Sequence, residues 1–244
     1  MKVILLAAGY ATRLYPLTKD KPKSLLDVAG KPMIEYIFDR INEVKGLDKV
    51  YIVSNARFYN NFLEWSKNYG DSKVEVLNDN TTSNETRLGG IGDMNFVIEK
   101  KKIEDDVLVI SGDNLFDFNL NKVIKFLKEK KSSIGVLYDV EDLELVKLYS
   151  CVEIDDKDRI ISFEEKPKNP KSTLSSIGIY IFKKEDLKLI KGYLEAGKNK
   201  DGPGYLIKYF SENHIVHGCS FKGRWFDIGD LNTLKKINEE FKNG

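Results

Sequence analysis

The chain has 244 residues, of which 41% are hydrophobic and 32% are charged, and its formal net charge at pH 7 is +1. This length is typical of one large domain, or of one domain with a small appendage. Because the charges nearly cancel, the composition gives no support for a general binder of nucleic acid or of membrane surfaces, and any cationic site has to be local.

Short apolar segments alternate with amphipathic segments through the first half of the chain. Periodicity predicts strands at residues 3–6, 50–53, 74–77 and 107–110, and helices at residues 32–43, 58–67, 89–100 and 120–130. The helical segments repeat apolar residues with helical spacing, whereas the strand segments are short and almost wholly apolar. This alternation is typical of βαβ units and predicts a mostly parallel sheet that is buried between helices.

The pattern changes in the second half of the chain. Strands are predicted at residues 134–139, 150–154, 160–165 and 174–182, and helices at residues 185–194, 205–211 and 231–241. The sequence Asp-Asp-Lys-Asp at residues 155–158 indicates a hairpin turn. Since no repeat and no long linker interrupts the chain, we expect a single α/β domain, Rossmann-like, with three layers and a mixed, mostly parallel central sheet.

Cysteine and hydropathy patterns favour a cytoplasmic protein without a membrane partner. Cys151 and Cys219 lack metal-ligand spacing and do not make a disulfide framework, so we expect buried, reduced thiols. The apolar run at residues 3–8 is shorter than the core of a signal peptide, and no segment approaches the roughly 18 apolar residues of a membrane span. His214 and His217 lie in a strand-like segment and are expected to be structural.

The first predicted strand ends at a small-residue turn that an arginine follows. Leu6 closes the strand, the small residues Ala7, Ala8 and Gly9 come next, and Arg13 stands a little further on. Ligands of open α/β sheets lie beyond the carboxyl ends of the strands. Small residues let a ligand approach backbone amides that can bind anions, and a guanidinium suits phosphate. The turn matches neither the P-loop nor the dinucleotide fingerprint, and from this stretch alone an ordinary tight turn is the alternative interpretation.

The continuation of this turn carries a more specific signal. Residues 6–36, LAAGYATRLYPLTKDKPKSLLDVAGKPMIEY, resemble the signature of the sugar nucleotidylyltransferases, which join a nucleoside triphosphate to a sugar 1-phosphate and release pyrophosphate. The resemblance implies a GT-A-like nucleotidyltransferase fold. It also implies that Arg13 grips the triphosphate and that Lys23 neutralises charge near the α-phosphate. Ala11 stands where the family usually has glycine, and alanine resists a positive φ.

Two carboxylates are the candidate ligands of a metal ion. Asp113 follows the predicted strand at residues 107–110, where a carboxylate suits Mg²⁺ held over phosphates, although a turn or a helix cap is the alternative. In the family that these segments resemble, the aspartate at the position of Asp113 holds the catalytic Mg²⁺. Asp227 lies in the segment GRWFDIGD, which resembles the family's Trp-x-Asp-x-Gly block, and the resemblance implies that it completes the metal site. Asp230 is expected to be the N-cap of the last helix.

The resemblance also implies a sugar-phosphate site and a base-reading segment. The Glu-Lys-Pro block gives Glu165 for the sugar hydroxyls and Lys166 for the phosphate. Gly178 lets the sugar lie against backbone, and Tyr180 either borders this site or belongs to the core. The nucleotide-binding residues that the resemblance implies are Leu6, Ala7, Ala8, Gly9, Asn84, Gly89 and Gly90. The glycines open a predicted helix, whose first amides can meet a ligand. Many family members carry a small residue where Asp93 stands, so the choice of base stays open.

We therefore expect a Mg²⁺-dependent nucleotidyltransferase whose partners are a nucleoside triphosphate and a sugar 1-phosphate, with no nucleic acid. The nucleotide is expected in residues 1–115 and the sugar phosphate in residues 116–244. Three alternatives remain: a choline-phosphate cytidylyltransferase of the same fold, a metal-dependent glycosyltransferase, and a catalytically silent nucleotide-binding protein. The sequence leaves the base, the sugar and the oligomeric state undetermined.

Overall fold

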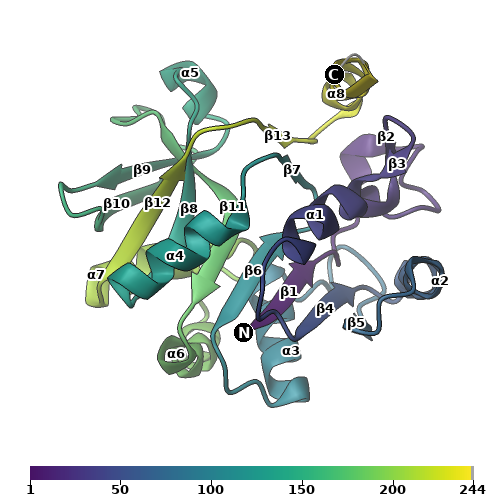
Figure 1. The fold of residues 1–244 in the computed structure, drawn as a ribbon, viewed down its shortest axis with the longest axis horizontal. Coiled ribbons are helices and arrows are strands. Elements are labelled where there is room, and N and C mark those ends of the chain that lie inside the picture. The colour runs from purple at the N-terminus through teal and green to yellow at the C-terminus, as the bar shows by residue number, and fades with distance from the viewer. Residues whose placement is uncertain (243–244) are drawn as a thin grey trace.

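A mixed sheet forms the middle layer of the computed structural model, which describes residues 1–242 (Figure 1). Within these residues the sheet has seven strands in the order β12-β8-β11-β6-β1-β4-β5. Their bounds are β1 Lys2–Leu6, β4 Lys49–Ser54, β5 Val74–Asn78, β6 Val107–Ser111, β8 Ser133–Asp139, β11 Leu174–Phe182 and β12 Val216–Phe221. Strand β11 runs antiparallel to its neighbours β6 and β8, whereas the other pairs are parallel. The predicted mixed, mostly parallel sheet is confirmed.

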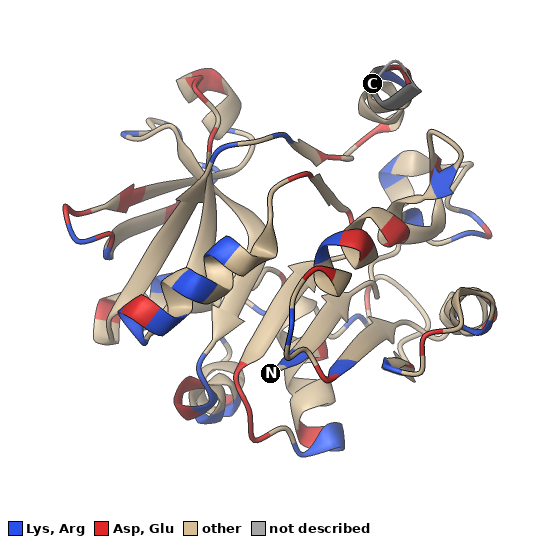
Figure 2. Cartoon of the chain, in the orientation of Figure 1, with Lys and Arg blue, Asp and Glu red and all other residues tan. Residues whose placement is uncertain are grey.

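Helices cover both faces of the sheet, which gives the three predicted layers. On one face lie α1 (Met33–Asn42), α2 (Tyr59–Tyr69) and α4 (Leu120–Lys130), and on the other lie α3 (Gly90–Lys101), α6 (Lys184–Glu195) and α7 (Gly204–Asn213). Successive side chains of β1 point to opposite faces of the sheet: Val3 and Leu5 pack in one hydrophobic cluster, and Ile4 packs in the other. Figure 2 shows charges of both signs interspersed over the helices and loops, while the strands are mostly uncharged.

Several short elements escaped the sequence prediction. The hairpin of β9 (Ser150–Ile154) and β10 (Ile160–Glu165) is confirmed. Two small sheets were not expected, namely β2 (Asp27–Val28) with β3 (Lys31–Pro32) and β7 (Asn114–Phe116) with β13 (Trp225–Asp227). The short helices η1 (Thr12–Leu14), η2 (Lys23–Leu25) and α5 (Leu143–Val146) were also missed. Such short pieces carry too few residues to show a period.

A third hydrophobic cluster anchors the segment that follows β1. Leu14, Leu26 and Val28 pack there against Ile228 and against the inner face of α8 (Leu231–Lys242). Burial of these side chains removes apolar surface from water and fixes the long connection between β1 and α1. Helix α8 therefore holds the opening loop from the far end of the described chain (Figure 1).

The histidines and cysteines have structural surroundings. His217 lies in β12, where its Nδ1 is 2.6 Å from the hydroxyl of Ser132, and burial lowers its pKa. His214 is not in a strand as expected, because it caps the end of α7. Cys151 and Cys219 are buried and free, as predicted. Among the described residues, the structure contains no helix with the length and apolar character that a membrane crossing requires.

Candidate active site

The loop after β1 is fastened to the two strands beside it. The backbone N–H of Ala7 donates to the carbonyl of Val53 at 3.0 Å, and the side-chain amide of Asn55 donates to the carbonyl of Ala8 at 2.8 Å. On the other side, the N–H of Gly112 donates to the carbonyl of Leu6 at 2.9 Å. These contacts hold the small-residue turn at the carboxyl ends of β4 and β6, where ligands of α/β sheets bind.

Ala11 adopts a left-handed backbone conformation, which is easier for glycine, the residue that the resembled family usually has at this position. Its φ is 45° and its ψ is 43°, which is the left-handed region, and Thr18 Oγ1 donates to its carbonyl at 2.8 Å. This backbone costs a residue with a Cβ about 1–2 kcal/mol. The departure from glycine at this position thus leaves a left-handed turn, from which Arg13 extends on η1.

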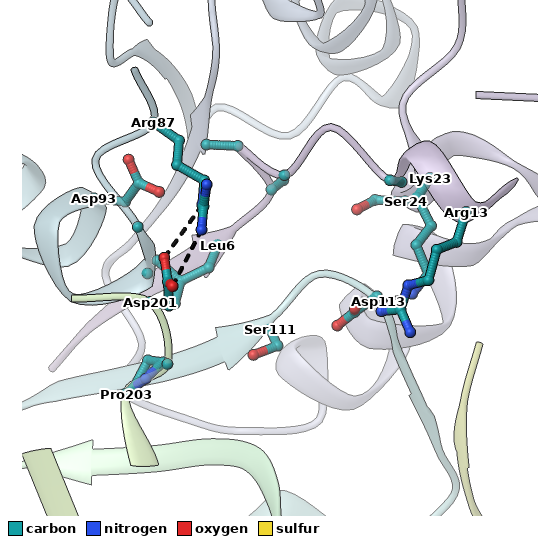
Figure 3. Close-up of a pocket in the computed structure, with 17 residues that line it drawn as sticks. Leu6, Arg13, Lys23, Ser24, Arg87, Asp93, Ser111, Asp113, Asp201 and Pro203 are labelled. Atoms are coloured by element: carbon teal, nitrogen blue, oxygen red, sulfur yellow. Dashed lines mark hydrogen bonds and ion pairs between the residues drawn. The ribbon is translucent and has the colours of Figure 1, made fainter. Parts of the chain in front are cut away.

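A first cavity of about 400 Å³ lies against this loop (Figure 3). It is lined by Leu6, Ala7, Ala8, Gly9, Ala11, Arg13, Lys23, Ser24, Arg87, Gly89, Gly90, Asp93, Ser111, Asp113, Asp201, Gly202 and Pro203. A Cβ built on Gly9 would meet no heavy atom within 4 Å, so the space beside this glycine is open. The predicted nucleotide residues therefore share one cavity, with the exception of Asn84.

Asn84 lies outside this cavity. Its side chain is exposed, and its backbone carbonyl accepts a hydrogen bond from Arg87 Nη1 at 2.7 Å. Its part in nucleotide binding stays a prediction.

Lys23 and Asp113 form an ion pair within the cavity. Lys23 Nζ lies 2.9 Å from Asp113 Oδ2, and the side chain of Lys23 is 13% exposed. Lys23 reaches this position because η2 begins at it, and Asp113 follows the end of β6. The ammonium and the Arg13 guanidinium bring positive charge to the place where the sequence predicted phosphates (Figure 3).

Asp227 joins the same charge cluster through the small β7–β13 sheet. In that sheet Asp227 is paired with Asn114, the residue that follows Asp113. Burial and then the charge of Asp113 raise the pKa of Asp227, whereas Lys23 and Arg13 oppose the rise. The two predicted metal ligands, 113 and 227, are therefore brought together by a pairing that the sequence analysis had not foreseen.

The pair of carboxylates fits a magnesium ion that also contacts substrate. Among the described residues, no group of three or more His, Cys, Asp or Glu side chains could hold a metal alone. Mg²⁺ is commonly bound by one or two carboxylates, with phosphates and water as the remaining ligands. Asp113 and Asp227 supply that number of carboxylates beside cationic side chains suited to phosphates.

A second cavity of about 580 Å³ adjoins the first. Both are lined by Arg13, Ser111, Asp113, Asp201, Gly202 and Pro203. The four predicted sugar-phosphate residues, Glu165, Lys166, Gly178 and Tyr180, line the second cavity together with Asp227. The predicted nucleotide and sugar-phosphate sites therefore meet at Arg13 and Asp113.

The backbone of the second cavity is held in unusual conformations. Lys166 has a φ of +48°, and its N–H donates to the carbonyl of Tyr149 at 2.7 Å. Gly178 has a φ of +73°, and a Cβ at this position would lie 2.7 Å from Ser111 Oγ. Left-handed backbone at non-glycine positions is uncommon and is over-represented at functional sites.

Tyr180 belongs to the core and to the cavity at once. Its ring is 4% exposed and stacks on Phe182, while its hydroxyl accepts a hydrogen bond from Ser176 Oγ at 3.0 Å. Burial raises its pKa to about 12, so the phenol stays neutral. Partial enclosure also raises the pKa of Glu165, which Lys166 opposes.

Aromatic rings form another part of the second cavity's wall. Tyr149 meets Trp225 edge to face, with 5.1 Å between the ring centroids, and Trp225 Nε1 donates to Asn114 Oδ1 at 3.1 Å. Phe163 and Tyr205 line the cavity as well. Such rings can pack against the apolar face of a sugar or attract a quaternary ammonium group.

Residues 199–203, which we call the strap, cross the start of α3. The N–H groups of Gly90 and Ile91 donate to the carbonyls of Asp201 and Lys200, at 2.7 and 2.9 Å. A Cβ on Gly89 would lie 2.5 Å from the Lys200 carbonyl oxygen. The expectation that the first amides of this helix meet a ligand is therefore wrong for these two, because the strap occupies them.

An ion pair locks the strap in place. Arg87 donates to both carboxylate oxygens of Asp201, at 3.2 and 3.1 Å, and Lys200 Nζ donates to the carbonyl of Arg87 at 2.8 Å. The sequence analysis missed the strap as a cavity wall. Its visible signal was the turn Gly202-Pro203-Gly204 within a lysine-rich loop, opposite the glycines at the start of α3.

Asp230 is confirmed as the cap of the last helix. Its Oδ1 accepts hydrogen bonds from the N–H groups of Asn232 and Thr233, at 2.8 and 2.9 Å. These contacts satisfy amides of the first turn of α8 and explain why Asp227, rather than Asp230, lines the second cavity.

Fold and site together define a three-layer α/β protein with a cavity lined by cationic side chains at the carboxyl edge of its sheet, and comparison with known proteins makes this class specific. The family model described as nucleotidyl transferase matches residues 2–244. The chain therefore belongs to the nucleotidyl transferase family.

Individual relatives agree with this assignment. The chain is 34% identical over 240 residues to a protein of Sulfolobus acidocaldarius named as a mannose-1-phosphate guanyltransferase, and 28% identical over 250 residues to the bifunctional protein GlmU of Methanocaldococcus jannaschii. These matches cover 98% and 99% of the chain but only 63% and 56% of the relatives, so the chain spans about half to two thirds of their length.

A solved structure supports the fold. UDP-glucose pyrophosphorylase complexed with UDP-glucose aligns with a TM-score of 0.82 at 21% identity, covering 99% of this chain and 98% of that one. This likeness concerns the three-layer architecture.

Proposed function

We propose that the chain transfers a nucleotidyl group from a nucleoside triphosphate to a sugar 1-phosphate and releases pyrophosphate. The observation that carries this proposal is the meeting of the two cavities at Arg13 and Asp113, beside the Lys23–Asp113 ion pair. One cavity offers the small-residue loop for a triphosphate, and the other offers Lys166 and Glu165 for a phosphorylated acceptor.

The reaction is an in-line displacement at phosphorus. An oxygen of the sugar phosphate attacks the α-phosphorus of the triphosphate, and the bond to the β-phosphate oxygen breaks, so that pyrophosphate carries away the electron pair. The attacking oxygen is already anionic, and the main obstacle is repulsion between two polyanions. Catalysis then comes from positioning and charge stabilisation rather than from a strong base.

Three cationic side chains oppose that repulsion. Arg13 holds the triphosphate with a planar fork of donors, and Lys23 neutralises charge near the α-phosphate. Lys166 holds the phosphate of the acceptor, and Gly178 lines the same cavity, where the sugar would lie. Asp113 and Asp227 would hold Mg²⁺, which when bound supplies a Lewis acid for the phosphate oxygens.

A choline-phosphate cytidylyltransferase of the same fold is a second candidate function. The observation that favours it is the aromatic wall of Tyr149, Phe163 and Trp225 beside Glu165, since rings and a carboxylate suit a quaternary ammonium. The cationic loop with Arg13 and Lys23 favours both of these functions over a glycosyltransferase, which does not need it. The intact cluster of Arg13, Lys23, Asp113 and Asp227 argues against a silent protein.

Pyrophosphate release tests the proposal. The purified chain is incubated with Mg²⁺ and each common nucleoside triphosphate, against a panel of hexose 1-phosphates, an amino-sugar 1-phosphate and choline phosphate. Acceptor-dependent release with a sugar 1-phosphate supports the proposal. Release with choline phosphate alone replaces it by the second candidate, and hydrolysis or inactivity across the whole panel contradicts both.

A further inference from the structure

A buried acid lines the first cavity at a distance from its cationic end. Asp93, in the first turn of α3, is 6% exposed and lines the cavity together with Arg87 and Gly89. Its Oδ1 has no hydrogen-bond partner among the residues that the structure describes. Figure 3 shows Asp93 beside Arg87, on the opposite side of the cavity from Lys23. A buried acceptor without a donor costs free energy, but Oδ1 itself is closed off, so a ligand in the cavity reaches this carboxyl group through its other oxygen.

Burial, and then the neighbouring Asp79, keep the carboxyl group of Asp93 neutral. Asp79 follows β5, is 7% exposed, and accepts hydrogen bonds at its Oδ1 from the N–H and the hydroxyl of Thr81, at 2.7 and 2.8 Å. Burial and then the Asp79 charge raise the pKa of Asp93 to about 8, although Lys200 of the strap lowers it. Two adjoining carboxyl groups of this kind share one proton. The shared proton faces Asp79, which leaves Asp93 with oxygen acceptors for a ligand.

Charge decides how a nucleotide lies in this cavity. The phosphates are drawn to the end with Arg13 and Lys23, and the negative charge of Asp79 behind Asp93 repels them from the other end. Arg87 is paired with Asp201, and Lys200 offsets only part of this repulsion, whereas the other end of the cavity has Arg13 beside the Lys23–Asp113 pair. The uncharged part of the nucleotide, its base, therefore lies toward Asp93.

We propose that Asp93 reads the nucleobase, accepting a hydrogen bond from an amino group of the base, so that the chain prefers guanine, adenine or cytosine nucleotides to those of uracil or thymine. This inference rests on the proposed function. It adds a selectivity that the family membership does not supply, since Asp93 occupies a position where many members of the resembled family have a small residue.

Hydrogen-bonding capacity explains the direction of the preference. Guanine, adenine and cytosine each present an amino group on the edge used in base pairing, and guanine adds a ring N–H next to it. Uracil and thymine present one N–H between two carbonyl oxygens. The carbonyl oxygens of uracil or thymine cannot form hydrogen bonds with the oxygens of Asp93, because the only proton of this carboxyl group is donated to Asp79.

Calorimetric titration of the whole chain tests the inference. GTP, ATP, CTP, UTP and dTTP are titrated with Mg²⁺ into the wild type, Asp93→Ala and Asp93→Asn. Glu99→Ala is the matched control, because Glu99 lies on the same helix but is exposed and outside the cavity. Circular dichroism checks that each variant is folded.

The wild type is expected to bind its best amino-bearing triphosphate about tenfold more tightly than UTP and dTTP, as one hydrogen bond in a buried site allows. Asp93→Ala should reduce this ratio to about threefold or less, whereas Glu99→Ala should keep it. A wild type that prefers UTP or dTTP, or a ratio unchanged in both folded Asp93 variants, overturns the inference alone. If no triphosphate binds, the proposed function fails as well. The wild-type ranking decides the matter even if the variants do not fold.

Discussion

Replacing Gly178 by alanine should damage both the fold and the second cavity. Gly178 has a φ of +73°, and a Cβ there would lie 2.7 Å from Ser111 Oγ and 3.0 Å from Asn114 Nδ2. The amide of Asn114 cannot easily move away, because it donates to the carbonyl of Ile177 at 2.5 Å and its oxygen accepts from Trp225.

Two costs add in this variant. The left-handed backbone costs a residue with a Cβ about 1–2 kcal/mol, and overpacking a tight site costs about 1–3 kcal/mol. We therefore expect Gly178→Ala to lower the free energy of unfolding by about 2–5 kcal/mol, which for a chain of this size lowers the Tm by roughly 4–20 °C.

Gly192→Ala is the matched control. Gly192 lies within α6, and a Cβ there would meet no heavy atom within 4 Å. Alanine in a helix interior is favoured over glycine, so this variant should gain about 0.5–1 kcal/mol. Differential scanning calorimetry and urea unfolding measure both changes. If Gly178→Ala has the same Tm as the wild type while Gly192→Ala is stabilised, the argument from crowding at Gly178 is wrong.

Four further predictions concern side chains of the two cavities. Arg13→Ala should weaken triphosphate binding by about one to two orders of magnitude, because a charge-assisted hydrogen bond contributes about 1.5–3 kcal/mol. Arg13→Lys should restore only part of the affinity, because lysine lacks the planar fork of donors, and calorimetry measures both variants. Lys166→Ala should raise the KM of the acceptor far more than that of the triphosphate, and an equal rise for both in steady-state kinetics would remove Lys166 from the acceptor site. Asp113→Asn and Asp227→Asn should each reduce kcat in Mg²⁺ by about a hundredfold or more while folding survives, and near-normal turnover of either would exclude that residue from the metal site. The pKa of Asp93 is raised from 3.8 to about 8, so the folded protein retains a proton that the unfolded chain has lost between these values. This contribution to stability is complete at the acid end and is lost as the pH rises toward about 8, by up to about 1.4 kcal/mol per pH unit. Urea unfolding should therefore show Asp93→Asn gaining on the wild type from about pH 5 to pH 8 and levelling off above, and a pH-independent difference would contradict the raised pKa.

Periodicity was sufficient for six of the seven strands of the main sheet and for its covering helices, although β12 was not among the predicted strands, and the signature named most of the residues that line the two cavities. The four predicted strands of the first half appear with ends within one or two residues, because β1, β4 and β6 are mostly buried and apolar and the edge strand β5 keeps a short run of apolar residues. Arg13, Lys23 and Asp113 also meet in one cavity, since the ends of neighbouring parallel strands share an edge.

Contacts between distant backbone segments could not be predicted in the same way. The strap binds the start of α3 through backbone carbonyls. Every residue type has a backbone carbonyl, so the sequence does not show which carbonyls accept these hydrogen bonds. Gly89 and Gly90 were therefore interpreted as room for a ligand, whereas much of that room is taken by residues 200 and 201. The pairing of β7 with β13 was missed because each strand has only three residues.

The strap has a consequence for the synthesis of the protein on the ribosome. Arg87 and its partner Asp201 are 114 residues apart in the chain. At about 5–20 residues per second, translation takes on the order of ten seconds to cover that distance. During this interval the nascent chain has its small-residue loop and the start of α3, but Arg87 has no carboxylate and the amides of Gly90 and Ile91 have no carbonyls from the strap. The first cavity is thus begun by some of the earliest residues made and closed by some of the later ones, so a partly synthesised chain does not yet have the finished cavity.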